Sequence, residues 1–372
     1  MNKLALKTFF VGFAFWYGLG LLHPNNEMVA DWPATVGIIC LFVVCFTAAH
    51  LIGYRFRRWR SFFGNRNQHR ISAWFFAVSV CSCSVLLAVS DTAFAYHAVR
   101  VAATGGILSF FAWWHLPSQQ RQAFIVFFFL LLLASLLFYS RRPFLTIAAT
   151  PLVLFLLRQQ KGFKFGRVLV ALCISWALLC VVTGIRYSDG TGFDVIALFR
   201  LGAENLSSAV GFDTIFLTDF VILYYREGAY LFGETFVAGF LNFIPRAFWP
   251  DKPYAFGIIL SSAFFNVNLD ETFTNFGPGI VAEAYANGGP LAVSLAACAF
   301  GCGVGILDSY IDRVRDGRSA LLACMLLPAV FFFVRGDFVN SFYEFYAKWL
   351  VAFFLLKIFG GWSSLRYPPF KY

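Results

Sequence analysis

Apolar residues fill the chain in continuous runs of about 15 to 22 positions, with short polar stretches between them. An α-helix needs about 20 apolar residues to cross the hydrocarbon core of a bilayer, so such runs are typical of membrane-spanning helices. A membrane β-barrel is disfavoured because its strands alternate apolar and polar residues. The pattern predicts an all-α, polytopic integral membrane protein of about 10 to 12 transmembrane helices.

The apolar runs predict ten spans, which divide the chain into three regions. Residues 1–185 hold the N-terminal transmembrane helices, 186–289 form a large loop region, and 290–372 hold the C-terminal transmembrane helices. The predicted spans are Leu4–Leu22, Ala34–Tyr54, Ile71–Val89, Ala95–Trp114, Ala123–Tyr139, Thr146–Leu157, Val168–Ile185, Pro290–Leu307, Ala320–Val334 and Asn340–Phe359.

Two more apolar stretches lie inside the loop region, at Ala209–Tyr225 and Ala229–Phe243. Acidic residues interrupt both, namely Asp213, Asp219 and Glu234. These stretches either form an additional hairpin of spans or lie as amphipathic helices on the outer face of the membrane. Both arrangements leave the rest of the loop region on one side, because a hairpin returns the chain to the side it left.

The distribution of charge predicts which side that is. The formal net charge is +10, yet eleven of the 19 acidic residues lie between 186 and 289. Cytoplasmic loops of membrane proteins are rich in Lys and Arg, so the acidic region is expected to face the periplasm. Nucleic-acid binding gains no support, since the bases form two blocks between apolar runs: Arg55, Arg57, Arg58, Arg60, Arg66 and Arg70, then Arg158, Lys161, Lys164 and Arg167.

The nine cysteines all fall within apolar runs, and none lies in the loop region. They are therefore predicted to be packing residues, without disulfides or metal. Cys81-Ser82-Cys83 lacks the spacing and the histidine of a zinc site. We expect neither a metal nor another cofactor.

The stretch from Leu241 to Gly289 is polar and punctuated by proline and glycine. Its part Ile244–Pro253 contains three prolines, which fix φ and disfavour helix in the residues before them, so a stiff non-helical loop is predicted. Such a loop can direct Arg246 and Lys252, beside Trp249, at an anionic group carried by a lipid or sugar. An external loop with solvated charges explains the same residues equally well.

Arg200 and Arg246 are each followed, after ten intervening residues, by a glycine: Gly211 and Gly257. With these two motifs and the strings IPRAFWPDKP and GIVAEAYANGG, roughly residues 195–340 resemble the Wzy-type O-antigen polymerases, or oligosaccharide repeat unit polymerases. The first half is similar to that family only in being hydrophobic and multi-spanning.

The resemblance implies a metal-independent membrane glycosyltransferase of GT-C-like fold in the bacterial inner membrane, with its active site facing the periplasm. Its substrate would be an oligosaccharide repeat unit linked to undecaprenyl pyrophosphate, polymerised into the O-antigen of lipopolysaccharide or a related surface polysaccharide. Membrane lipids and a chain-length regulator protein are the other partners that the resemblance implies.

The implied reaction releases a pyrophosphate, so cations must face the developing negative charge. Arginine suits this role because its planar fork bonds phosphate oxygens in pairs and stays protonated. Arg200 and Arg246 are therefore expected to be catalytic, while Lys252 and Arg335 are expected to bind substrate. Gly211 and Gly257 complete the two motifs.

An acceptor hydroxyl also needs a proton acceptor, and the loop region contains no histidine. Glu283 is the preferred base because it follows the turn Gly277-Pro278-Gly279, and because Tyr285 and Asn287 beside it can hydrogen-bond a sugar. Asp337 is the second candidate. Glu283 is equally suited to orienting an arginine through a salt bridge.

Two smaller motifs add expectations. Gly301 and Gly305 lie four positions apart within an apolar run, which predicts close packing of two helices rather than a nucleotide loop. Arg335 and Asp337 lie at the outer end of a span, where they either complete a site at the membrane boundary or pair with each other. A flippase for lipid-linked sugars and an O-antigen ligase are the alternative functions, and the concentration of polar residues in one loop favours the polymerase.

Overall fold

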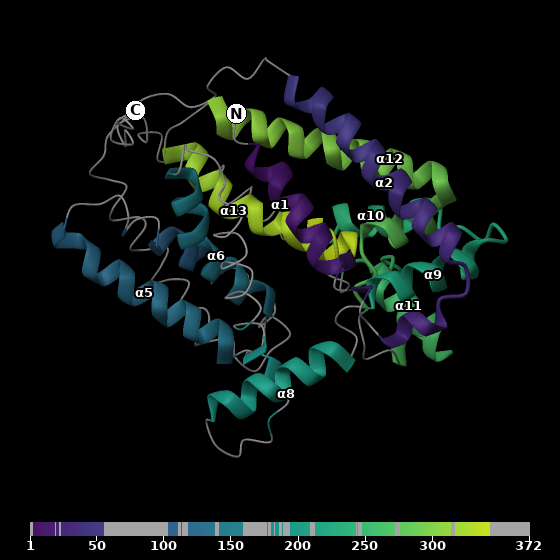
Figure 1. Ribbon diagram of the computed structural model, residues 1–372, viewed down its shortest axis with the longest axis horizontal. Coiled ribbons are helices and arrows are strands. Elements are labelled where there is room, and N and C mark those ends of the chain that lie inside the picture. Colours follow the sequence, from purple (N-terminus) through teal and green to yellow (C-terminus); the bar gives the residue numbers. More distant parts are fainter. Residues whose placement is uncertain are drawn as a thin grey trace.

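The computed structural model describes residues 3–18, 20–21, 24–55, 103–110, 113, 118–137, 141–158, 177, 180–181, 183–185, 188, 194–208, 213–242, 244, 248–271, 276–313 and 317–342. All regular elements in these ranges are helices, as the all-α prediction requires (Figure 1). The predicted span Ile71–Val89 lies outside the described residues, as do most of Ala95–Trp114, Val168–Ile185 and Asn340–Phe359.

The elements follow one another in the order α1 (Leu4–Phe13), the π-helix η1 (Ala14–Gly18), the 3-10 helix η2 (Pro24–Met28), α2 (Trp32–Arg55), α5 (Ser118–Leu137), α6 (Arg141–Arg158), α8 (Val195–Ser208), α9 (Thr214–Tyr225), α10 (Glu234–Phe240), α11 (Phe256–Phe265), the 3-10 helix η3 (Leu269–Glu271), α12 (Ile280–Arg313) and α13 (Gly317–Phe333).

The long helices pack in successive pairs. Figure 1 shows α2 beside α12 along one edge, then α1 beside α13, then α6 and finally α5. The short helices α9, α10 and α11 gather near the end of this bundle where α12 begins. Two of the described helices, α2 and α12, are long and apolar enough to span a membrane.

α2 and α12 approach each other closely because glycines line their contact. A Cβ atom on Gly301 would overlap the carbonyl oxygen of Phe46, and one on Gly305 would overlap that of His50. Gly53 of α2 is equally close to the carbonyl of Cys302. The close packing predicted from the spacing of Gly301 and Gly305 is confirmed.

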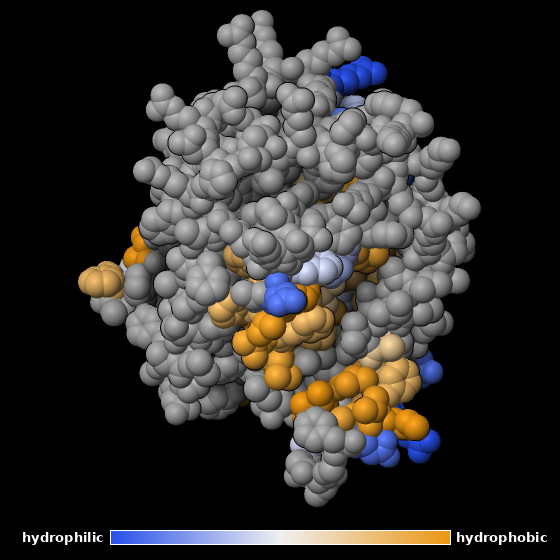
Figure 2. Space-filling model, turned by 90° about the vertical axis from the view of Figure 1, so that its left-hand side faces the viewer, coloured by the Kyte–Doolittle hydropathy of each residue, from blue (hydrophilic) through white to orange (hydrophobic). Residues whose placement is uncertain are grey.

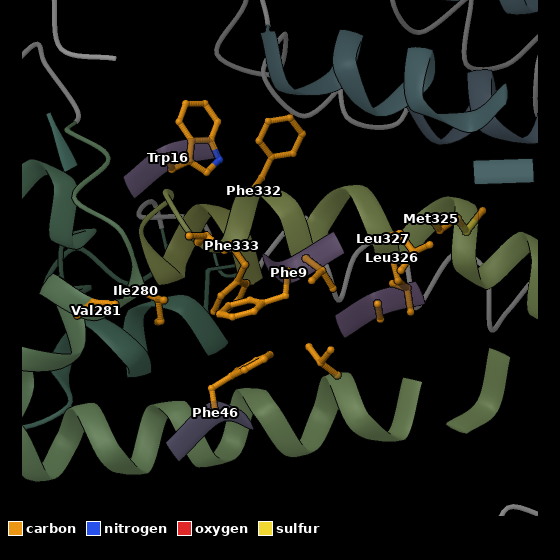
Figure 3. Close-up of a cluster of buried hydrophobic side chains, with 14 of the residues drawn as sticks. Phe9, Trp16, Phe46, Ile280, Val281, Met325, Leu326, Leu327, Phe332 and Phe333 are labelled. Atoms are coloured by element: carbon orange, nitrogen blue, oxygen red, sulfur yellow. The ribbon is translucent and has the colours of Figure 1, made fainter. Parts of the chain in front are cut away.

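Aromatic rings fill the space between the first two helix pairs. The Phe9 ring stacks on Phe46 with centroids 3.7 Å apart, and the Phe300 ring stacks on Phe333 with centroids 4.3 Å apart. Figure 3 shows Phe9 pointing between Phe46 of α2 and Phe333 of α13. Packing of these rings from four helices stabilises the bundle, since each aromatic pair contributes about 0.5 to 1.5 kcal/mol through its ring contact.

The lengths of α9 and α10 bear on the two interpretations of residues 209–243. α9 has 12 residues and α10 has 7. At 1.5 Å per residue, neither is long enough to cross a hydrocarbon core about 30 Å thick. Asp219, which interrupts the first stretch, is buried and accepts hydrogen bonds from the backbone N–H groups of Ala30 and Asp31 just before α2.

α12 is broken near its start. Gly289 has φ of 62° and ψ of −152°, and a Cβ atom there would lie 2.7 Å from the Tyr230 hydroxyl. Only glycine fits such a backbone without strain. Pro290 follows, and its lack of an N–H also favours the break. The eight residues 280–287 thus form a separate helix that precedes the apolar part of α12.

Candidate functional site

Glu283 lies on this first part of α12, and its side chain is fully buried. The preceding residues 276–279 are not helical, as the Gly-Pro-Gly turn predicts. One carboxylate oxygen of Glu283 accepts a hydrogen bond from the backbone N–H of Phe338, 55 positions later. Glu283 thereby joins α12 to the segment that follows α13.

Asp337 is the neighbouring carboxylate, 1% exposed. Its oxygens accept hydrogen bonds from the backbone N–H of Asn340 at 3.0 Å and from its side-chain amide at 2.9 Å, so it caps the helical turn at 338–342. Glu283 and Asp337 are close enough to interact electrostatically. Two buried carboxylates side by side are costly unless a proton or a cation compensates them.

Asn287 holds α10 against this part of α12. Its side-chain amide donates to the Thr235 hydroxyl at 2.7 Å and to the Glu283 carbonyl at 2.8 Å. Its side-chain oxygen accepts the Gly233 N–H at 3.0 Å. Asn287 is thus occupied by protein groups, while Tyr285 is buried with its ring edge-to-face on Tyr230.

Arg335 lies two residues before Asp337 in the turn after α13. Its guanidinium carbon is 5.0 Å from the centre of the Trp16 ring, within range for a cation–π contact. Its side chain also lies close to Gly277, because a Cβ atom added to that glycine would be 3.6 Å from the Arg335 Nη1. Asp337 accepts its hydrogen bonds from Asn340, and an ion pair of Arg335 with Asp337 stays a prediction.

An apolar cavity of about 560 Å³ opens beside these residues. α10, the part of α12 after the break, the end of α13 and the turn at 338–342 line it. Phe338 connects it to the carboxylates: its N–H binds Glu283, and its residue forms part of the cavity wall. Other lining residues include Phe236, Phe240, Asn287 and Phe342.

The remaining predicted site residues are not brought to this place. Arg246 and Gly211 lie outside the described residues. Arg200 is exposed on α8 and makes no ion pair or hydrogen bond within the described part of the chain. Gly257 is buried at the start of α11, where its carbonyl accepts hydrogen bonds from Phe276 and Ser261.

Lys252 and Trp249 belong to the proline-rich loop, which is non-helical at residues 244 and 248–255 as predicted. Lys252 is 8% exposed, and its ammonium donates to the Asn242 carbonyl, the Asn242 side chain and the Ile244 carbonyl at 2.9 to 3.1 Å. These three acceptors match the three N–H donors of the ammonium, so Lys252 links one part of the loop to another. Trp249 is half-buried in the same loop.

Sequence reasoning missed three residues of the site: Trp16, Thr235 and Phe338. Phe338 contributes its backbone N–H, and because every residue except proline has this group, the amino-acid type gives no sign of the role. Trp16 reaches the site from η1, directly after α1 and more than 300 positions before Arg335, so no local sequence signal predicts the contact. The described residues contain no group of three or more His, Cys, Asp or Glu side chains that could hold a metal ion.

No protein-family model, curated protein or solved structure matches the chain.

Proposed function

We propose that this protein is a membrane-embedded glycosyltransferase that polymerises lipid-linked oligosaccharide repeat units, as the resemblance to the Wzy-type polymerases implies. The observation that carries the proposal is the arrangement around Phe338: a buried pair of carboxylates on one side of it and an apolar cavity on the other. Such a site suits an amphipathic substrate with a polar reacting end and a long hydrocarbon tail.

In this proposal the first isoprene units of the carrier lie in the apolar cavity, and the sugar and pyrophosphate lie toward Glu283, Asp337 and Arg335. Glu283 accepts the proton of the attacking sugar hydroxyl, because a carboxylate with few hydrogen-bond donors is a stronger base than a well-solvated one. Arg335 faces the charge on the leaving pyrophosphate. Arg200 and Arg246 stay predicted ligands of the pyrophosphate from the sequence resemblance alone, since the structure does not place them at this site.

The surface of the helices supports a membrane setting. Large apolar side chains are exposed along α2, α5 and α12, at Val44, Ile52, Val126, Phe129, Leu291 and Leu295. Figure 2 shows hydrophobic residues gathered on the face where α5 lies. Exposed apolar area on several helices is favourable in hydrocarbon and unfavourable in water. We therefore propose an inner-membrane protein of about ten spans whose site faces the periplasm.

Incubation of the purified protein with a defined lipid-linked repeat unit tests the function. A ladder of products on a gel is the expected result. Transfer of intact substrate across a liposome membrane without a ladder would replace the polymerase with a flippase, and transfer of glycan only to a lipid A core acceptor would replace it with a ligase.

Orientation is tested separately by cysteine labelling in whole cells. A cysteine placed at Asp270, in the acidic region, should react with a membrane-impermeant thiol reagent, whereas one at Gly64, in the first basic block, should react only after lysis. The reverse pattern would overturn the proposed topology.

A further inference from the structure

The N-terminal segment contacts the candidate site through the π-helix η1, which directly follows α1. π-Helical turns insert an extra residue and occur frequently at functional sites. Here η1 carries two consecutive aromatic residues, Trp16 and Tyr17, each 5% exposed. Both belong to the half of the chain in which the sequence predicts no site residue.

Trp16 contacts the turn that follows α13. Its ring lies 5.0 Å from the Arg335 guanidinium carbon. Two phenylalanines fix the ring: Phe15 lies edge-to-face with it at 4.9 Å, and Phe331 lies tilted against it at 5.8 Å. A ring held between neighbours in this way offers Arg335 one fixed face.

Tyr17 contacts the turn that precedes Glu283. A Cβ atom at Gly279 would lie 3.2 Å from the Tyr17 hydroxyl and 2.6 Å from the Val334 carbonyl. The Tyr17 ring stacks on Phe13 of α1, with centroids 4.5 Å apart. η1 therefore touches both of the turns that carry the site, 276–279 and 334–337.

We propose that Trp16 is a positioning residue, which holds the Arg335 guanidinium in the direction needed to bind the pyrophosphate of the lipid-linked substrate. An arginine side chain has many rotamers, and fixing it before the ligand arrives lowers the entropy lost on binding. The ring contacts the face of the guanidinium, whereas the N–H donors point outward in its plane, which is the direction from which phosphate oxygens bind an arginine. This inference rests on the proposed function in taking a pyrophosphate as the ligand of Arg335.

Binding of undecaprenyl pyrophosphate to the purified full-length protein in detergent tests the inference, with undecaprenol as the ligand that lacks phosphate. Arg335→Ala should weaken the affinity for the pyrophosphate about tenfold or more. Trp16→Leu should weaken it about threefold to thirtyfold, and Trp16→Phe, which keeps a ring, by less than Trp16→Leu. Undecaprenol affinity should be the same for all of these proteins.

A double-mutant cycle separates positioning from general damage. If Trp16 acts through Arg335, Trp16→Leu should cause no further loss of affinity in the Arg335→Ala background. Phe10→Leu is the matched control, since Phe10 is an aromatic residue of α1 that is 38% exposed, and it should leave the affinity unchanged. In the polymerisation assay, Trp16→Leu should raise the KM for the donor with little change in kcat.

Equal loss from Trp16→Leu with and without Arg335 would overturn the inference, as would equal loss for undecaprenol. The polymerisation assay tests the proposed function independently of the binding cycle. Wild-type protein that makes a ladder while Trp16→Leu binds normally keeps the polymerase and removes the role of Trp16. Pyrophosphate binding that follows the cycle, with no ladder, keeps the inference and removes the polymerase. Wild-type protein that binds both lipids equally removes both.

Discussion

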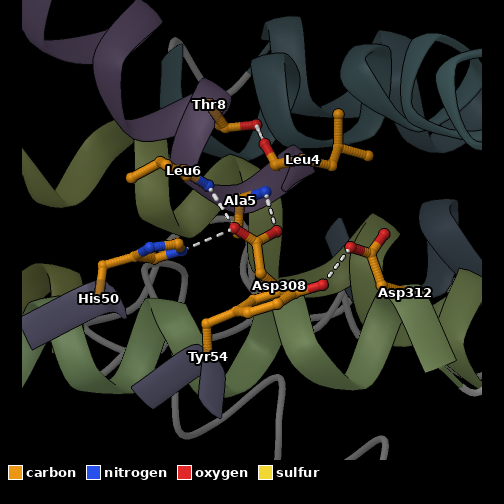
Figure 4. Close-up of polar contacts among 8 residues, drawn as sticks. All are labelled: Leu4, Ala5, Leu6, Thr8, His50, Tyr54, Asp308 and Asp312. Carbon is orange, nitrogen blue, oxygen red and sulfur yellow. Dashed lines mark hydrogen bonds and ion pairs between the residues drawn. The ribbon is translucent and has the colours of Figure 1, made fainter. Parts of the chain in front are cut away.

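A buried carboxylate lies near each end of α12, and the two carboxylates differ in the number of hydrogen-bond donors around them. Asp308, near the last turn, accepts hydrogen bonds from the Ala5 and Leu6 N–H groups at 2.6 and 2.9 Å, and lies 3.0 Å from the His50 Nε2 (Figure 4). Glu283, in the first turn, accepts the N–H of Phe338 and faces the carboxylate of Asp337.

The difference separates a structural carboxylate from a candidate for chemistry. Asp308 lies at the N-terminal end of α1, where free amides and the helix dipole favour an anion, so its charge is compensated within the protein. Glu283 has a like charge as its neighbour and an apolar cavity nearby. A protein that only needed a stable fold would gain from an apolar residue there, so the carboxylate is better explained by a ligand that compensates it.

Replacement of Asp308 is expected to have the largest effect, and on stability. Asp308→Ala leaves the buried His50 and the first amides of α1 without their acceptor, which should cost about 3 to 5 kcal/mol in the free energy of unfolding. Thermal unfolding in detergent measures this loss. Asp312→Ala is the control, because Asp312 is only half-buried and accepts the Tyr54 hydroxyl near the surface, as Figure 4 shows, so its loss should cost less. An unchanged melting temperature for Asp308→Ala would show that Asp308 is not a structural carboxylate.

Replacement of Glu283 should affect activity instead. Glu283→Gln keeps the size of the side chain and loses its basicity, so polymerisation should fall by about two to four decades. The melting temperature should be equal to the wild-type value or higher, because the repulsion from Asp337 is removed. Glu234→Gln, at an exposed position on α10, is the matched control and should be active.

The rate as a function of donor concentration decides what Glu283 does. A low plateau for Glu283→Gln supports the general base. If excess donor restores the rate, Glu283 orients an arginine or another binding group and does not take the proton. Wild-type activity in Glu283→Gln would remove it from the site altogether.

A smaller effect on stability is expected for the glycine contact between α2 and α12, which lies between Glu283 and Asp308 along α12. Gly301→Ala forces a methyl group against the Phe46 carbonyl, which should cost about 1 to 3 kcal/mol and leave the site residues in place. Gly303→Ala is the control two residues away, since a Cβ atom there has no neighbour within 4 Å. Equal melting temperatures for the two variants would show that the helices are farther apart than the structure has them.

The sequence was informative where the signal is local. Apolar runs predicted α2 within two residues at each end, and the spacing of Gly301 and Gly305 predicted a close helix contact. The Gly-Pro-Gly motif predicted the non-helical turn before Glu283, although the predicted span began only at Pro290, and the prolines predicted the non-helical loop around Trp249. Glu283 and Asp337 are alternative bases in the sequence, and the structure brings both within electrostatic range of each other.

Contacts between distant segments could not be predicted. His50 and Asp308 are 258 positions apart, and neither stands in a recognisable motif. Lys252 was expected to face a ligand, yet the bends of its own loop bring three acceptors to its ammonium. The stretches at 209–243 are apolar enough for spans, and only the lengths of α9 and α10 show where the helices end.

The smallest expected effect concerns Asp219, another buried carboxylate, which resembles Asp308 in having several hydrogen-bond donors. It accepts the N–H groups of Ala30 and Asp31 and, at 2.8 Å, the hydroxyl of Thr35. If well-matched carboxylates are structural, losing one donor of three should be tolerated, so Thr35→Val should cost about 0.5 to 1.5 kcal/mol and leave activity unchanged. Thr47→Val, which removes only a bond to the Val43 carbonyl within α2, should cost less. A fall in polymerisation with Thr35→Val at an unchanged melting temperature would place Asp219 with Glu283 instead.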